Sequence, residues 1–193
     1  MFDFSKAPDP NDFDLVPAGT VAVVEIKIRP GDAGEDGILK RTKAGDAEGL
    51  DLELTLVSGK FAKRKLWMFL LFSGTTDNQK QMAERNQGII KAILESARGI
   101  RRADVSETAK AARQIEGLHE LNGLRFLAKI EIEPEKNGYR AKNILGRVIR
   151  PDDKDWQPVE QPPPQPVSPA DAAADVPSSS SSPKEIKKPD WAK

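Results

Sequence analysis

Three basic residues directly before two aromatic ones form the part of this sequence best suited to contact a ligand. Residues 59–72 read GKFAKRKLWMFLLF, in which Lys63, Arg64 and Lys65 precede Trp67 and Phe69. Cationic side chains follow phosphates, and an aromatic ring that stacks on a base contributes roughly 1–3 kcal/mol. This combination is typical of surfaces that bind single-stranded nucleic acid.

Two other segments offer further cations, and the second of them also offers an aromatic residue. Residues 30–49 form a glycine-rich, charged stretch, and residues 135–142 follow it much later in the chain. Their candidate ligand-binding residues are Lys40, Arg41, Lys43, Tyr139, Arg140 and Lys142. The first stretch also fits a merely mobile charged loop, because several Asp and Glu residues oppose its cations. Tyr139 fits a strand-filling residue as well as a stacking platform.

The basic residues are concentrated in the middle of a chain whose formal net charge is zero. Residues 61–102 contain 9 Lys and Arg against 3 Asp and Glu, a net charge of +6. Such segregation favours an anionic partner, although an internally balanced, solvated surface also explains it.

Several function classes have little support. The chain has no Cys and one His, so it offers no thiolate or histidine cluster for a metal. Neither the phosphate-binding motif GxxxxGK[ST] nor the dinucleotide-binding motif GxGxxG occurs, and we expect no cofactor. A remote alternative is a Mg²⁺-dependent nuclease, in which Asp14 and Glu25 would hold the metal and Lys27 would position the attacking water.

The elements that must position these residues begin with strands. Residues 19–30 alternate Val24, Ile26 and Ile28 with charged residues, which is the period of a strand. Residues 49–56 place four leucines on one face, and residues 58–59 form a short turn into the third strand. We therefore expect the second and third strands to be antiparallel neighbours.

Helical periodicity follows these strands. Residues 75–98 have apolar residues at helical spacing, with Thr75, Thr76 or Asp77 as the N-cap and Gly99 after the end. A second helix is predicted over about residues 104–117, because Asp104 and Glu107 have capping-box spacing. Two alternating runs joined by Asn137-Gly138 then predict a β-hairpin.

This order predicts a mostly β fold with a helical insert. Five antiparallel strands with a helix between the third and fourth match the OB-fold barrel, and other five-stranded α+β folds fit the same order. If Leu66 and Leu70 point inward, Trp67 and Phe69 lie on the outer face. A shift of one residue would instead place Trp67 in the core.

The end of the chain has a different composition. Residues 151–193 hold 10 of the 15 prolines and a run of five serines, so we predict a disordered tail after a nucleic-acid-binding domain of residues 1–150. Removing this tail is not expected to affect folding. Trp156 and Trp191 are candidate docking motifs for replication or recombination proteins.

The acidic N-terminus and the short apolar runs predict a cytoplasmic protein without a membrane span.

The order of several motifs resembles a phage-encoded family of OB-fold single-stranded-DNA-binding proteins, long catalogued as a domain of unknown function. The resemblance covers roughly residues 2–150. It rests on FDFSK, FDLVPAG, RTKAGDAEGLDLEL, GKFAKRKLW, GIIKAILESARGI, ELNGLRFLAKIEIE and NGYRAKNIL. It implies a protein of the bacterial host cytoplasm that coats single strands, independently of their sequence, in phage replication or recombination.

The C-terminus departs from cellular single-strand binders, because KEIKKPDWAK is mixed in charge rather than acidic. Asp51 and Glu53 also oppose the prediction, since they share the expected binding side and would repel phosphate unless Arg64 or Lys65 paired with them. An OB-type module that binds protein without nucleic acid therefore remains an alternative, and a homo-oligomer is compatible with either function.

Overall fold

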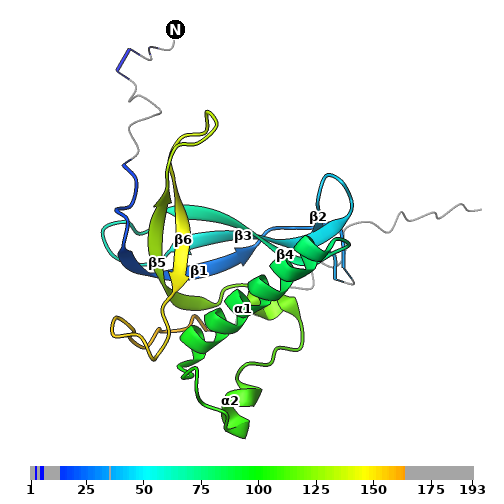
Figure 1. Ribbon diagram of the computed structural model, residues 1–193. Helices are drawn as coiled ribbons and strands as arrows, with labels where there is room; N and C mark the ends of the chain where they lie inside the picture. Colours follow the sequence, from blue (N-terminus) through cyan, green and yellow to red (C-terminus); the bar gives the residue numbers. More distant parts are fainter. Residues whose placement is uncertain (1–2, 4, 7–13, 35, 164–193) are drawn as a thin grey trace, which may run out of the picture. The chain divides into compact units, whose positions relative to one another are not determined.

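Six antiparallel strands and a long helix form the framework of the computed structural model, which describes residues 3, 5–6, 14–34 and 36–163 (Figure 1). The strands are β1 (Thr20–Ile28), β2 (Lys40–Arg41), β3 (Ala47–Leu56), β4 (Lys65–Gly74), β5 (Arg125–Glu133) and β6 (Lys142–Val148). The helices are α1 (Asp77–Arg98), α2 (Glu107–Ala111) and the 3₁₀ turn η1 (Leu118–Leu121). The predicted mostly β fold with a helix after the third long strand is confirmed.

The strands pair in an order that differs from their order in the chain. β3 lies between β1 and β4, while β1 also pairs with β5, and β5 pairs with β6. The predicted antiparallel pairing of the second and third long strands is therefore correct. β2 is an additional short strand in the segment predicted to be a loop, and it pairs with the start of β3.

The core lies on one face of this sheet. The predicted leucine stripe of β3 is buried, with at most 1% of any of its four leucines exposed. Ile90, Ile93 and Leu94 of α1 pack into the same cluster as Phe126 of β5. Burial of these apolar side chains stabilises the fold at about 25 cal/mol per Å² and fixes which strand residues face outward.

Both ends of α1 are capped as the sequence predicts. Thr76 is the N-cap: its side chain accepts a hydrogen bond from the Gln79 N–H, and the Gln79 side chain bonds the Thr76 N–H in return. Gly99 ends the helix at φ 69°, a left-handed conformation that glycine adopts without steric cost.

The second helix is shorter than predicted. It spans Glu107–Ala111, and its N-cap is Ser106 rather than Asp104. Contacts with α1 explain the early end, because Arg98 of α1 donates hydrogen bonds to the carbonyls of Ala112 and Gln114. These tertiary contacts replace the helical turns that the local pattern predicts.

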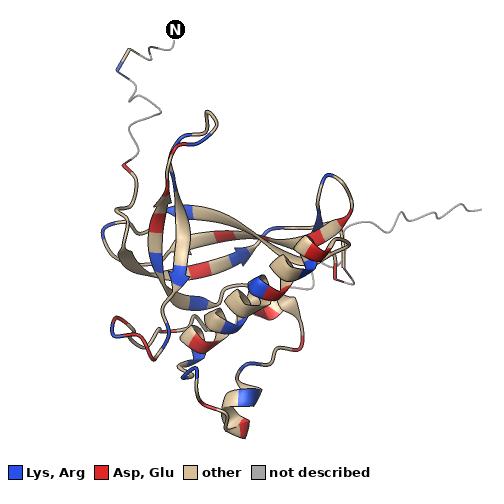
Figure 2. Ribbon diagram, viewed as in Figure 1, with Lys and Arg blue, Asp and Glu red and all other residues tan. Residues whose placement is uncertain are grey.

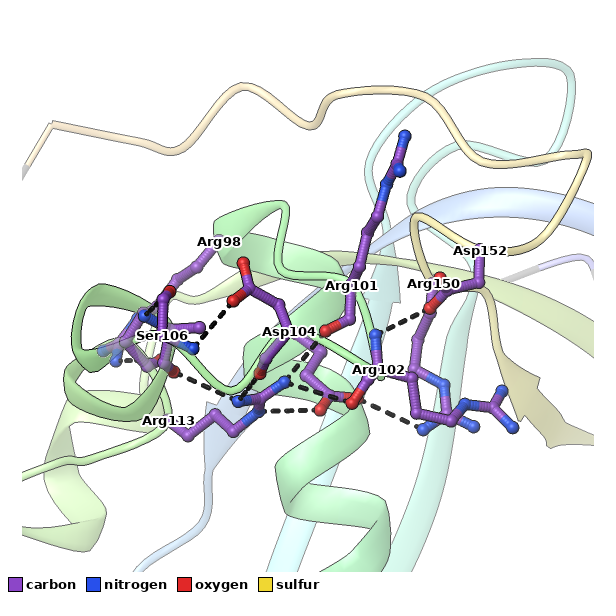
Figure 3. Close-up of polar contacts among 11 residues, drawn as sticks. Arg98, Arg101, Arg102, Asp104, Ser106, Arg113, Arg150 and Asp152 are labelled. Atoms are coloured by element: carbon purple, nitrogen blue, oxygen red, sulfur yellow. Dashed lines mark hydrogen bonds and ion pairs between the residues drawn. The ribbon is translucent and has the colours of Figure 1, made fainter.

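A buried carboxylate organises this part of the chain. Glu95 of α1 is fully buried, and its two oxygens pair with Arg113 at 2.8 Å and with Arg150 at 3.2 Å. Arg113 also donates to the backbone carbonyls of Arg101 and Asp104 (Figure 3). The network therefore ties the connection between α1 and α2 to the helix itself.

The β5–β6 connection is the predicted tight hairpin. Asn137 and Gly138 both have positive φ, at 55° and 77°, and Lys136 and Tyr139 exchange backbone hydrogen bonds across them. This is the geometry of a two-residue turn in which both central residues are left-handed, and it is the reason Asn-Gly is favoured there.

The folded part continues beyond the predicted boundary at Arg150. The first compact unit ends at Pro162. The Trp156 indole N–H donates to the Ser96 carbonyl, and the Gln161 side chain bonds both the N–H and the carbonyl of Arg125. Residues of the segment 151–162 therefore pack on α1 and β5, whereas Trp191 lies outside the described residues.

Candidate nucleic-acid interface

Trp67 and Phe69 lie on the outer face of β4. Trp67 is 60% exposed and Phe69 is 43% exposed, whereas Leu66 and Leu70 are buried. The alternation has the predicted parity, and the alternative that places Trp67 in the core is wrong. Exposed aromatic side chains of this size on one strand are available to a ligand.

Two rows of residues cross β1, β3 and β4 on this face. In the first row Lys27 is opposite Glu53, and Glu53 is opposite Trp67. In the second row Asp51 is opposite Phe69, and Arg29 extends the β1 ladder by donating its N–H to the Asp51 carbonyl at 2.9 Å. Residues directly opposite each other share a face, so each row reads cation, carboxylate, aromatic.

Two lysines from outside these rows complete the surface. Lys40 of β2 and Lys65 at the start of β4 both reach carboxylates of β3. We call the resulting surface the β1–β3–β4 face; it consists of Lys27, Arg29, Lys40, Asp51, Glu53, Lys65, Trp67 and Phe69. Both basic and acidic residues lie on the strands of the sheet (Figure 2).

The carboxylates of the face are paired with its cations. Asp51 Oδ2 lies 2.9 Å from Lys40 Nζ and 3.3 Å from a terminal nitrogen of Arg29. Glu53 Oε1 lies 2.7 Å from Lys65 Nζ, which is one of the two pairings predicted for Glu53. Asp51 is neutralised too, by Lys40 of β2 and by Arg29.

The charge state of Glu53 follows from these neighbours. The hydrogen bond from Lys65 lowers the pKa of Glu53 below its ordinary value, and the positive charges of Lys65, Lys27 and Arg29 add to this effect. Glu53 is therefore ionised at neutral pH and acts as a fixed negative charge between the two flanking strands.

A glycine gives the Phe69 ring its position. A Cβ atom at Gly49 of β3 would lie 2.6 Å from the tip of the Phe69 ring and 2.5 Å from the Leu70 carbonyl oxygen. These distances are shorter than van der Waals contact, so a side chain at position 49 would clash with the Phe69 ring and with the β4 backbone. Only glycine at this position lets the ring lie over β3.

The ligand-binding residues predicted in segments 40–43 and 63–65 do not all lie on the same surface. Lys40, Lys65, Trp67 and Phe69 belong to the β1–β3–β4 face. Arg41 pairs with Glu48 at 3.2 Å, and Lys43 lies exposed in the turn between β2 and β3. Lys63 has φ 69° in the turn before β4, and Arg64 precedes the first residue of that strand.

The third predicted group lies on the β5–β6 hairpin. Tyr139 is 79% exposed at the turn, so it is not a strand-filling residue. Arg140 is exposed beside it, and Lys142 pairs with Glu133 across the hairpin at 2.9 Å. These residues occupy the projecting arm that β5 and β6 form in Figure 1.

Sequence reasoning missed Lys27 and Arg29 as members of the face. The signal was present in the β1 alternation, which places both on the side opposite Val24 and Ile26. Lys27 was considered only for the nuclease alternative. The pairing of β1 and β4 with opposite edges of β3, which the local pattern does not reveal, brings Lys27 and Arg29 onto the same face as Trp67.

One of the two carboxylates of the nuclease alternative is engaged in an ion pair. Glu25 pairs with Arg125 of β5 at 2.7 Å. Within the described part of the chain there is no group of three or more His, Cys, Asp or Glu residues arranged to hold a metal ion. In the same residues, no helix has the length and apolarity required to cross a bilayer.

A comparison of the chain with known protein families finds no matching family, and a comparison with curated proteins finds no significantly similar sequence.

Proposed function

We propose that this protein binds single-stranded DNA independently of its sequence, through stacking on Trp67 and Phe69 and phosphate contacts from the surrounding cations. The observation that supports this most directly is the pair of cation–carboxylate–aromatic rows on the β1–β3–β4 face. Every base has an aromatic face, so two exposed rings on one strand suit stacking that does not depend on base identity.

The strand order supports an OB-type barrel as the scaffold. β1, β3 and β4 form a meander, β5 returns beside β1, and α1 lies between β4 and β5. An OB barrel has this arrangement and requires in addition that β4 and β6 meet, and residues of these two strands do approach each other. Ligands of OB-folds lie across the second and third long strands, which are β3 and β4 here.

Each part of the face has a role in this proposal. Trp67 and Phe69 stack on successive bases, and Lys27, Arg29, Lys40 and Lys65 contact the phosphates that connect them. The single-stranded DNA that extends beyond the face has further predicted contacts, which are Arg41, Lys43, Lys63, Arg64, Tyr139, Arg140 and Lys142. The resemblance of residues 2–150 to the phage family supports a role in phage replication or recombination.

A protein-binding module is the second candidate. Its support is that the two carboxylates reduce the positive charge of the face, while exposed aromatic and Arg side chains are also typical of protein interfaces. Salt distinguishes the two, because binding to a nucleic acid weakens linearly in log–log with salt. An apolar protein interface responds much less.

The test is a titration of labelled oligo-dT with the wild-type protein and with Trp67→Ala, followed by fluorescence anisotropy at two salt concentrations. We expect wild-type binding to weaken with salt and Trp67→Ala to lose roughly 1–3 kcal/mol of binding free energy, the value of one stack. The melting temperature should change little, because the exposed ring leaves no cavity when it is removed.

Val105→Ala is a matched control, since Val105 is an exposed apolar residue between α1 and α2. Its oligo-dT affinity should equal that of the wild type. A Trp67→Ala protein that is folded and binds oligo-dT as tightly as the wild type would exclude the stacking role. Anisotropy of the label avoids interference from Trp156, whose indole is hydrogen-bonded to the folded body.

A further inference from the structure

The β1–β3–β4 face contains two carboxylates in the position where a nucleic-acid-binding surface usually has none. Asp51 and Glu53 stand on the central strand, with the β1 cations on one side and the aromatic rings of β4 on the other. A phosphate that approaches the cations from the stacked bases therefore passes over a negative charge.

Both carboxylates are built into the surface. The side chains of Asp51 and Glu53 are only 12% and 17% exposed, whereas Arg29, Lys40 and Lys65 are about half exposed. The cations can therefore reach a ligand, but each already has a negative partner. The face holds four cations, Lys27, Arg29, Lys40 and Lys65, and two carboxylates, which leaves a net charge of +2.

This charge balance affects duplex and single-stranded ligands differently. Duplex DNA carries one negative charge per roughly 1.7 Å of its axis, and attraction to its phosphates does not require unpaired bases. Stacking on Trp67 and Phe69 does require them. A face with less positive charge thus loses more affinity for duplexes than for single strands, because each phosphate contact contributes more to duplex binding: the log–log salt slope per contact is about 0.9 on duplex DNA and about 0.7 on single strands. The stacking part of the single-strand binding free energy is unaffected.

We propose that Asp51 and Glu53 are specificity-determining residues, internal counter-charges that limit attraction to phosphates and so select unpaired bases over duplex DNA. This inference rests on the proposed single-strand binding by the same face. The carboxylates form ion pairs with the cations, and a phosphate must replace a carboxylate before it can bind. Phosphate contacts therefore add little net binding free energy, and most of the affinity for single strands comes from stacking on the aromatic rings.

The test uses the full chain with Asp51→Asn and Glu53→Gln, separately and together. These substitutions remove the charge and keep an oxygen that accepts hydrogen bonds from the same cations. The probes are a labelled oligo-dT of about 16 nucleotides, the upper site size of one OB domain, and a blunt duplex of equal length. Affinities for both are measured by anisotropy at several salt concentrations.

We expect the double variant to bind the duplex at least about tenfold more tightly and oligo-dT only a few-fold more tightly, so that the preference for single strands decreases. The salt dependence should become steeper, by up to about 0.7 in log–log slope for each additional phosphate contact on the single strand. Glu53→Gln alone should show part of both effects.

The matched control is Glu84→Gln with Glu107→Gln, which removes the same charge from exposed positions on α1 and α2. Its preference for single strands should equal that of the wild type. Melting curves of all variants establish that they are folded. Glu53→Gln continues the test if the less exposed Asp51 position does not tolerate substitution.

The possible results separate the two proposals. If the wild type binds neither probe, single-strand binding itself is wrong. If the wild type binds oligo-dT through Trp67 but folded variants keep its ratio of single-strand to duplex affinity, only the role of Asp51 and Glu53 is overturned. Weaker binding of both probes by the variants would also overturn it, since the carboxylates would then serve to position the cations.

Discussion

Glu95 and Glu107 show how strongly the surroundings determine the value of an ion pair. Glu95 pairs with Arg113 at 2.8 Å, and Glu107 pairs with Lys110 at 2.7 Å. The Glu95 side chain is fully buried, whereas that of Glu107 is 90% exposed. Removing one partner of a buried pair leaves an uncompensated charge in the interior, while an exposed pair is screened by water.

We therefore predict that Glu95→Ala lowers the free energy of unfolding by about 3–5 kcal/mol, because Arg113 and Arg150 both lose their carboxylate partner. Glu107→Ala should change it by less than about 1 kcal/mol. Urea unfolding of both variants measures the difference. Equal effects would mean that the Glu95 network contributes no more than an exposed pair.

At the same scale, the sequence offered two orientations for Trp67, of which the structure has the outward one, and it did not predict the neighbours of Trp67. Alternation within β4 places Trp67 outward if Leu66 and Leu70 are buried, because the period of a strand is two, and the structure shows both leucines buried. The partners of Asp51 could not be predicted, since Arg29 and Lys40 reach it only through the pairing of β1 and β2 with β3.

Among the elements, β1 provides two of the cations that the proposal uses. Lys27 and Arg29 stand on its outward side, opposite Glu53 and Asp51. If both contact phosphate, Lys27→Ala with Arg29→Ala should weaken oligo-dT binding and lower the log–log salt slope by about 1.4, which is twice 0.7. The measurement is anisotropy over a range of salt concentrations.

Lys91→Ala with Lys110→Ala is the control for this element, because it removes the same charge from exposed positions on α1 and α2. Its slope should match that of the wild type. If the β1 variant and the helix variant have the same slope, β1 does not contact phosphate and the cations of β2 and β4 would carry that role.

The elements also show where local pattern reasoning stops. The caps of α1 and the Asn137-Gly138 turn were predictable because their causes lie within a few residues. The shortness of α2 was not, because its C-terminal end is set by Arg98, and Arg98 belongs to another helix. The strand β2 was hidden for the same reason, since two residues form a strand only against β3.

For the molecule as a whole, composition placed the end of the folded part too early. Proline-rich sequence after Arg150 predicts a chain without a core of its own. It does not predict whether single residues dock on the body, and Asp152, Trp156 and Gln161 do so. Asp153 also closes the turn that starts this segment, and its hydrogen bond from the Arg150 N–H lowers the pKa of Asp153.

We accordingly predict that a chain ending at Pro163 melts at the temperature of the full chain, whereas a chain ending at Arg150 melts about 5–15 °C lower. The shorter chain loses the hydrogen bonds of Trp156 and Gln161, each worth about 0.5–1.5 kcal/mol, together with the packing of the indole beside Gly99. Each 1 kcal/mol corresponds to roughly 2–4 °C in a protein of this size.

Differential scanning calorimetry of the three chains measures the effect, and Trp156→Ala in the full chain should reproduce part of it. Equal melting temperatures for all three chains would show that residues 151–163 add no stability and that the folded unit ends at Arg150.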